Sequence, residues 1–265
     1  MFQKLLLPIE LKRPVEDIKN RVSFLKSLGA TDIVLLNVAT PGLENSKHTK
    51  RLMDRMGSAL RELEVNVTLT IKTGHVSVQI VEASNEYKTD MIHIPWRKNQ
   101  LLHRLILGST TKEVVRLSEK PVFIDKDGPH RLYLKGITNI LYATDFNEAS
   151  ERALPYVAHL GTAERNLKLF HVGHRSADPY SEKRRIKATY TRLDELKQQF
   201  ESGYAQVETE ATIGTPHKHI LYKSKKDDVD LIITGRFNDR PLRQIIGSNT
   251  QEVADRAGCS MLVIP

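Results

Sequence analysis

The chain has 265 residues, 40% apolar and 27% charged, which suits two globular domains of ordinary size. Its net charge is +8, but residues 1–130 carry 20 basic and 15 acidic side chains and the rest 20 and 17. That even spread, without a nucleic-acid-binding motif, argues against a nucleic-acid partner. The single cysteine, Cys259, excludes an intramolecular disulfide, and no apolar run reaches the ~20 residues of a membrane span, so we expect a cytoplasmic protein with no membrane partner.

The first half alternates strand-like and helix-like segments. Apolar residues spaced for one helix face follow the first strand, and Gly29 stands where a helix would end. Strands are expected over residues 4–9, 32–38, 65–71, 91–94 and 121–124, and helices over 15–28, 44–62, 75–83 and 110–118.

The second half repeats this order. Thr215 as N-cap and Pro216 at the first helical position mark one helix start. The alternation predicts a parallel sheet with helices on both faces, so each half should be a doubly wound α/β sandwich. Strands are expected over residues 140–144, 167–172, 207–213, 230–234 and 260–264, and helices over 148–160 and 181–201.

One string occurs near the end of both halves. Gly108-Ser109 and Gly247-Ser248 are 139 residues apart (247 minus 108), and each follows an apolar run that begins after an Asp, at 90 and 230. That interval is too long for a solenoid repeat and fits a duplicated domain. We therefore expect domains over residues 1–126 and 136–265, joined by a linker over 127–135.

Four segments of the second half, residues 140–145, 150–154, 169–172 and 230–248, resemble the universal stress protein family. The resemblance in order and spacing covers nearly the whole chain. It implies two tandem sandwich domains of the adenine-nucleotide alpha-hydrolase-like type, each with a five-stranded, mostly parallel sheet. It further implies a non-enzymatic stress-response protein that binds ATP, ADP or AMP, with Mg²⁺ as a candidate companion. The closing strands would join the domains as an internal pseudo-dimer, and two chains could form a homodimer.

Nucleotide-binding members of that family carry a loop of the form G-x2-G-x9-G-[ST], and both copies depart from it. Pro95 and Lys98 replace the first two glycines of the first copy, and Asn238 replaces the middle glycine of the second, whose loop is one residue shorter. Proline has no N–H for a phosphate, whereas asparagine tolerates positive φ. We therefore expect nucleotide binding chiefly in the second domain. The residues that the resemblance assigns to it are Asp145, Val172, Gly235, Arg236, Asn238, Gly247, Ser248 and Asn249.

Several of these residues allow a second interpretation. The Gly247-Ser248 segment could hold an anion at a helix start, or Ser248 to Gln251 could be a capping box without a ligand. Asp145 could bond a ribose or a metal–phosphate unit, or cap the next helix. Arg236, Arg240 and Arg243 could meet phosphates or simply be solvated. In the first copy, Ser109 and Thr110 are expected to cap a helix, with Glu113 completing a box.

The histidine pairs and the motif content of the sequence do not indicate a metal site or a catalytic site. His171 with His174, and His217 with His219, lack further ligands at metal-binding spacing, so we expect structural or solvated histidines. The sequence contains no nucleophile elbow, P-loop or zinc-protease motif. Two alternatives stay open: an interaction module of the same fold that binds no nucleotide, and a nucleotide-processing enzyme on the same scaffold.

Overall fold

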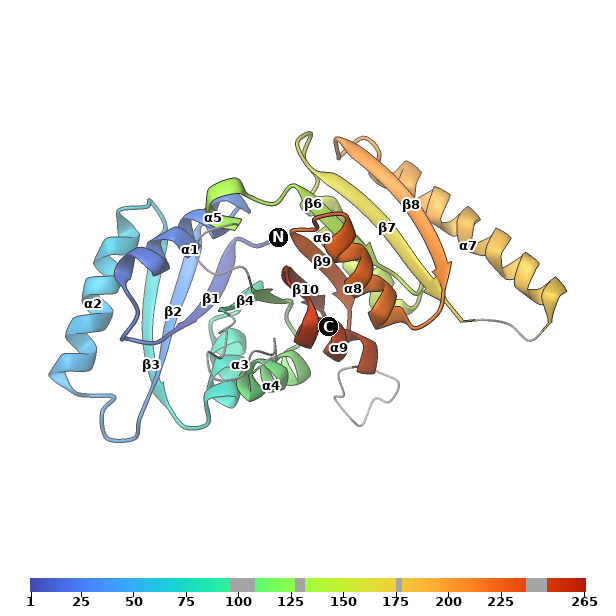
Figure 1. Cartoon of the computed structure of the whole chain (residues 1–265). Helices are drawn as coiled ribbons and strands as arrows, with labels where there is room; N and C mark the ends of the chain where they lie inside the picture. Colours follow the sequence, from blue (N-terminus) through green and yellow to red (C-terminus); the bar gives the residue numbers. More distant parts are fainter. Residues whose placement is uncertain (96–107, 127–131, 175–177, 237–246) are drawn as a thin grey trace. The chain divides into compact units, whose positions relative to one another are not determined.

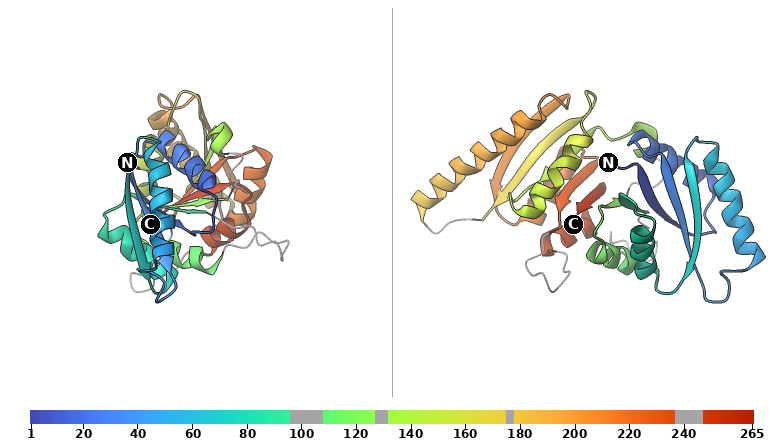
Figure 2. Two further views of the ribbon diagram at one scale, coloured as in Figure 1. Left: turned by 90° about the vertical axis from the view of Figure 1, so that its left-hand side faces the viewer. Right: turned by 180° about the vertical axis from the view of Figure 1, so that it is seen from behind.

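A computed structural model of the chain describes residues 1–95, 108–126, 132–174, 178–236 and 247–265. Within these residues, 1–95, 108–126 and 132–136 form one compact unit, and the others form a second. Figures 1 and 2 show the alternation of strands and helices along the chain.

The first unit is a parallel sheet whose described strands lie in the order β3-β2-β1-β4-β5. The sheet is built on continuous apolar runs such as Leu5 to Leu7, all of them fully buried. Its strands are β1 (Lys4–Ile9), β2 (Asp32–Ala39), β3 (Asn66–Thr73), β4 (Met91–Pro95) and β5 (Val122–Asp125). Its helices are α1 (Val15–Ser27), α2 (Lys47–Arg61), α3 (Val76–Glu86), α4 (Ser109–Leu117) and the short α5 (Leu132–Lys135).

The second unit repeats the arrangement, with its described strands in the parallel order β10-β9-β6-β7-β8. Its long helix α7 runs along β7 and β8 (Figures 1 and 2). The strands are β6 (Asn139–Ala143), β7 (Asn166–Gly173), β8 (Gln206–Ile213), β9 (Leu231–Gly235) and β10 (Ser260–Ile264). The helices are α6 (Glu148–His159), α7 (Pro179–Phe200), α8 (Pro216–Lys226) and α9 (Ser248–Arg256).

The strand order fixes where each helix lies. In the second unit the chain steps outward from β6 to β7 to β8, and then crosses back to β9 and β10 on the other side of β6. Right-handed crossovers therefore place α6 and α7 on one face and α8 and α9 on the other. The order reverses between β6 and β9, as it does between β1 and β4 in the first unit. The predicted doubly wound α/β fold with a parallel sheet is confirmed in both copies.

The repeated aspartate before β4 and β9 has the same structural role in both units. Oδ2 of Asp90 accepts hydrogen bonds from the N–H groups of Gln3 and Lys4, both at 2.9 Å. Oδ2 of Asp230 accepts bonds from the N–H groups at positions 138 and 139, also at 2.9 Å. Each carboxylate thus ties the start of the unit's first strand to the strand beside it.

The first unit contains a buried polar cluster at two strand positions that hold isoleucine in the second unit. His93 on β4 and Asp125 on β5 are fully buried, with 3.8 Å between Nε2 and Oδ2, and Arg21 on α1 is also buried. The Tyr133 hydroxyl on α5 donates a hydrogen bond to Asp125, which holds this short helix against the domain. By strand register, positions 93 and 125 correspond to Ile233 and Ile264. Part of the predicted linker, 132–135, is therefore a helix packed on the first unit.

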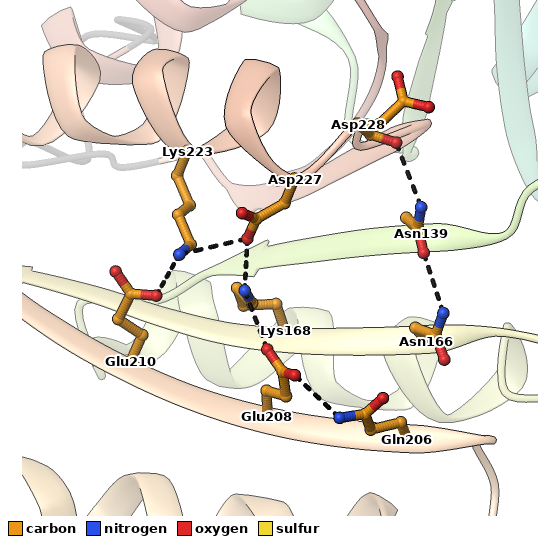
Figure 3. Close-up of polar contacts among 9 residues, drawn as sticks. All are labelled: Asn139, Asn166, Lys168, Gln206, Glu208, Glu210, Lys223, Asp227 and Asp228. Carbon is orange, nitrogen blue, oxygen red and sulfur yellow. Dashed lines mark hydrogen bonds and ion pairs between the residues drawn. The ribbon is translucent and has the colours of Figure 1, made fainter.

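An ion-pair network covers the amino ends of β7 and β8 in the second unit (Figure 3). Nζ of Lys168 lies 2.9 Å from Oε2 of Glu208 and also pairs with Asp227, which follows α8. Lys223 of α8 pairs with Asp227 at 3.3 Å and with Glu210. Burial opposes the charge on Lys168, but the hydrogen bonds that it donates to its two carboxylate partners raise its pKa above the ordinary value. The network fixes the end of α8 onto the two outer strands.

None of the helices in the described part of the chain combines the length and the apolar content needed to cross a membrane.

Candidate functional site

The carboxyl ends of β6, β7 and β9 in the second unit meet around a cavity of about 700 Å³. It lies at the switch point between β6 and β9, the position at which open α/β sheets bind their ligands. Helices α7, α8 and α9 complete the wall. Residues on the wall include Thr144, Asp145, Val172 and Gly235 from the strand ends, and Arg185, Pro216, Ile220, Ser248 and Asn249 from the helices.

Asp145 follows β6 and organises the turn into α6. Its Oδ1 accepts a hydrogen bond from the Ser150 hydroxyl at 2.6 Å and one from the Asn147 N–H at 3.3 Å, and its Oδ2 accepts one from Asn147 Nδ2 at 2.9 Å. A carboxylate has about four acceptor sites. The exposed Asp145 therefore retains acceptor capacity toward the cavity.

The N-cap of α6 is Asn147, whose side chain accepts from the Ser150 N–H at 2.9 Å. The sequence-based alternative that Asp145 caps this helix is therefore wrong. Asp145 lies two residues too early for the role, and it positions the capping residue instead.

The Phe146 ring packs against His171 and Arg192 beside the cavity. Its centroid lies 4.8 Å from that of the His171 ring, and the Arg192 guanidinium of α7 lies over the Phe146 ring at 4.6 Å from the centroid. The backbone of Phe146 has a φ of 59°, which a bulky residue rarely adopts. Nη2 of Arg192 donates to the Phe146 carbonyl at 3.3 Å, so this side chain of α7 stabilises the turn.

His171 at the end of β7 is oriented by its Nδ1, which lies 2.9 Å from the Thr144 carbonyl oxygen. A carbonyl only accepts, so Nδ1 carries the proton and Nε2 presents a lone pair. Burial, together with the nearby charges of Arg185 and Arg192, lowers the His171 pKa below its ordinary value. The ring is therefore neutral at neutral pH. Its bond to Thr144 gives it a structural role, one of the two roles expected for it.

Gly235 ends β9 against the first turn of α6. A Cβ at this position would lie 2.5 Å from the carbonyl carbon and oxygen of Ala149 and 2.9 Å from the N–H nitrogen of Ser150. The glycine is thus required for packing, because its neighbours are backbone atoms that cannot move aside cheaply. It also keeps the strand end open beside the cavity.

Helix α9 begins at Ser248, with Gly247 as its N-cap, and no side chain caps it. The predicted capping box over residues 248–251 is therefore wrong, since Ser248 already lies inside the helix. The first N–H groups of a helix lack intrahelical partners and carry a partial positive charge. Gly247, Ser248 and Asn249 all line the cavity, so these donors face a place where an anion can bind.

Of the predicted site residues, the structure brings six to the cavity wall. They are Asp145, Val172, Gly235, Gly247, Ser248 and Asn249. Arg236 is buried, and its N–H donates to the Ile264 carbonyl at 2.5 Å; it is not among the wall residues. Asn238, Arg240 and Arg243 lie outside the described residues.

Sequence reasoning missed Asn147 and Ser150, which hold Asp145, and Arg185, which reaches the cavity from α7. The spacing Asn147-x-x-Ser150 before a helical pattern was an available capping signal. Nothing in the local sequence distinguishes Arg185 from its charged neighbours, because its role depends on how α7 packs.

The first unit carries different groups at the equivalent places. Strand register makes Glu10 the counterpart of Asp145, and Asn37 the counterpart of His171. Nδ2 of Asn37 donates to the Ile9 carbonyl at 3.2 Å, the same bond that His171 makes in the second unit. Helix α4 begins after Gly108 without a side-chain cap, and Glu113 accepts from Ser77 at 2.7 Å. The predicted capping by Ser109 and Thr110 is therefore wrong.

In the part of the chain that the structure describes, no group of three or more His, Cys, Asp or Glu side chains is placed to hold a metal ion.

Comparison with known proteins agrees with the duplicated architecture. The model of the universal stress protein family matches residues 27–126 and 136–265. Universal stress protein MJ0577 of Methanocaldococcus jannaschii is 27% identical over 150 residues, which cover 47% of this chain and 93% of that protein.

Two solved structures match nearly the whole chain. A universal stress protein from Archaeoglobus fulgidus has a TM-score of 0.71 at 21% identity, covering 99% of this chain and 96% of its own. A protein of unknown function from Pseudomonas aeruginosa, PA1789, has a TM-score of 0.74 at 18% identity, covering 98% and 92%. At these identities the two structures support the fold. The two family matches along the sequence show that this chain belongs to the universal stress protein family, with two such domains in tandem.

Proposed function

We propose that the second domain binds an adenine nucleotide, ATP or the related ADP or AMP, and that the protein acts by binding in a stress response. The observation that carries this proposal is the cavity at the switch point between β6 and β9, where six of the residues assigned from the sequence meet. Its volume of about 700 Å³ lies within the range of roughly 300–1,000 Å³ that is usual for small-molecule sites.

The start of α9 supports phosphate binding. Gly247 and Ser248 leave the helix without a side-chain cap, so its first N–H groups are available to an anion. The Ser248 hydroxyl adds a donor on the same wall. Mg²⁺ bound with the phosphates would neutralise part of their charge. The exposed carboxylate of Asp145 on the cavity wall would be a ligand for this ion.

The sugar and the base would occupy the rest of the cavity. Asp145 keeps an acceptor site for a ribose hydroxyl, since its described bonds use three of about four. The wall at the end of β7 and along α8 includes Val172, Pro216 and Ile220, an apolar surface suited to one face of a planar base.

We propose binding without catalysis, because the sequence lacks nucleophile and P-loop motifs. The altered loops favour a second candidate: an interaction module of the same fold that binds no nucleotide. Its support is that Pro95, Lys98 and Asn238 all replace glycines of the family's nucleotide loop.

The test compares equivalent substitutions in the two domains by calorimetric titration with ATP and Mg²⁺. Asp145→Asn should weaken ATP binding by about 10-fold to 100-fold, the usual value of a hydrogen bond to a charged group. Glu10→Gln changes the equivalent carboxylate of the first domain and should leave the affinity unchanged. Circular dichroism and the melting temperature of each variant would show that the fold is intact.

Three results would count against this proposal. Equal affinity in the wild type and Asp145→Asn would remove the assigned role of that carboxylate. A loss caused by Glu10→Gln alone would move the site to the first domain. ATP turnover that depends on Asp145 would replace binding with catalysis.

We further propose the assembly that the family resemblance implied, an internal pseudo-dimer of the two domains and a homodimer of chains in the cytoplasm. Sedimentation equilibrium of the purified chain measures the homodimer directly. A single species of monomer mass, at concentrations up to those used for titration, would remove it.

A further inference from the structure

One wall of the cavity comes from an element that carries no family motif. Helix α7 contributes Arg185, and among the described residues that line the cavity it is the only lysine or arginine. A nucleotide brings several negative charges into this space, and Asp145, which also lines the cavity, is itself acidic. The balance of charge in the described site therefore depends on Arg185.

The ion pair with Glu182 positions Arg185 but uses only part of its hydrogen-bonding capacity. Its Nη2 lies 2.8 Å from Oε2 of Glu182, one turn earlier on the same helix. A guanidinium presents five N–H donors in a planar fork, so one carboxylate contact leaves donors for a second anion. The side chain is 40% exposed, which is consistent with a group that can still accept a ligand.

The segment of α7 around Arg185 is not held by the hydrophobic core. All side chains at 182–192 are described and none is buried; the first buried one is Leu193, at 0% exposure. The second half of the helix packs on the sheet through Leu193 and Phe200. The first half is connected to the site through Arg185 and through the stack of Arg192 on Phe146.

We propose that Arg185 is the residue that senses ligand charge at this site, by binding the nucleotide phosphates and thereby fixing the first half of α7. The inference rests on the proposed function and deepens it. The ligand class it names is the phosphorylated nucleotide, in contrast to the uncharged nucleoside. Because none of the side chains at 182–192 is buried and the ring stack of Arg192 lies at the far end of this segment, a new charge-assisted bond at Arg185 increases the order of the residues around it.

The experiment measures ATP and adenosine affinity by calorimetry for the full-length wild type, Arg185→Gln and Arg184→Gln. Arg184 is an exposed arginine on the same turn and does not line the cavity, so it matches the charge change. Arg185→Gln should weaken ATP binding by about tenfold and leave adenosine binding within about twofold. Arg184→Gln should change neither.

A second readout follows the helix itself. Trypsin cleavage after Lys183, Arg184 and Lys187 should slow in the wild type when ATP is added, by about tenfold at saturation, if binding orders the segment. Adenosine should not slow it, and ATP should not protect Arg185→Gln. The cleavage rate reports the order of the first half of α7 even when the change in ATP affinity is small.

The outcomes separate the two proposals. A wild type that binds neither ATP nor adenosine removes both. A wild type that binds ATP, with Arg185→Gln unchanged in affinity and in protection, removes only the role of Arg185. An equal loss of ATP and adenosine binding in Arg185→Gln also overturns it, because Arg185 would then contact the base or sugar rather than the phosphates.

Discussion

Lowering the pH should destabilise the first domain through His93. The ring is fully buried, and neither of its nitrogens has a hydrogen-bond partner among the described residues. Burial, with the nearby charge of Arg21, lowers its pKa from 6.5 to about 3. In the unfolded chain the same ring takes up a proton near pH 6.5. Between pH 6.5 and 3 the unfolded state therefore binds one more proton than the native state, and stability falls as the pH falls.

The size of the effect follows from the shift. Each pKa unit corresponds to about 1.4 kcal/mol, so moving from pH 7.5 to pH 5 should cost about 2 kcal/mol through this group. His93→Ile places in β4 the residue that β9 has at the equivalent position, Ile233, and removes the titration. The acid sensitivity of the first domain should then fall by about 2 kcal/mol over the same pH interval.

The assay is urea unfolding at pH 7.5 and pH 5, with pulsed hydrogen exchange of peptides from β1 reporting the first domain separately. Carboxylates away from position 93 titrate alike in the wild type and the variant, so the difference between the two proteins is assigned to His93 and its buried neighbour Asp125. His48→Gln, an exposed histidine on α2, is the matched control and should behave as the wild type. An equal pH dependence of the unfolding free energy in the wild type and His93→Ile would show that protonation of His93 does not destabilise the first domain.

Two further predictions test the backbone around the site by comparing urea midpoints, with peptides from β6 and β4 reporting the two domains. Gly235→Ala should destabilise the second domain by roughly 1–3 kcal/mol, because its Cβ would meet the Ala149 backbone at 2.5 Å. Gly258→Ala, at an exposed position with open space around the added Cβ, should cost less than about 0.5 kcal/mol. Similar costs for the two would contradict the packing role. Asn147→Ala should destabilise the second domain by about 1 kcal/mol, because it removes the N-cap side chain of α6. Ser248→Ala should cost about 0.5 kcal/mol or less, because Ser248 does not cap α9. A larger cost for Ser248→Ala would support the capping box over residues 248–251.

The order of elements could be predicted because each strand is a continuous apolar run and each helix has a one-sided apolar pattern. Gly29, with a φ of 104°, ends the α1 segment where the sequence placed it. The internal repeat strengthened this prediction, because the same order of strands and helices was expected in both halves. The place of Asp145, Gly235 and Gly247 at one edge followed from parallel strands, whose carboxyl ends meet on the same side of a sheet.

The capping predictions failed for a physical reason. Ser and Thr near a helix start satisfy the pattern at several registers, and the backbone angles decide which residue is the cap. Gly108 and Gly247 take extended angles, with ψ of 150° and 141°, so the helices begin one residue earlier than a Ser or Thr cap requires. The hydroxyls at 109 and 248 then lie inside the helix.

Long-range groupings could not be predicted from local pattern. His93 stands in an apolar run that is indistinguishable from an ordinary core strand, and its companions come from α1, β5 and α5. Arg185 is one of several adjacent basic residues, and only the packing of α7 brings it to the cavity wall. Both cases depend on contacts between segments that are distant in sequence.

Nucleotide binding by the second domain is measured most directly by a calorimetric titration of the purified, nucleotide-stripped chain with ATP and Mg²⁺. We predict saturable binding with about one site per chain, since only the second domain keeps the assigned residues around a cavity in the described structure. Two sites would show that Pro95 and Lys98 are tolerated and that the first domain also binds. No heat at several temperatures, with a melting temperature unchanged by high ATP, would contradict nucleotide binding and leave an interaction module.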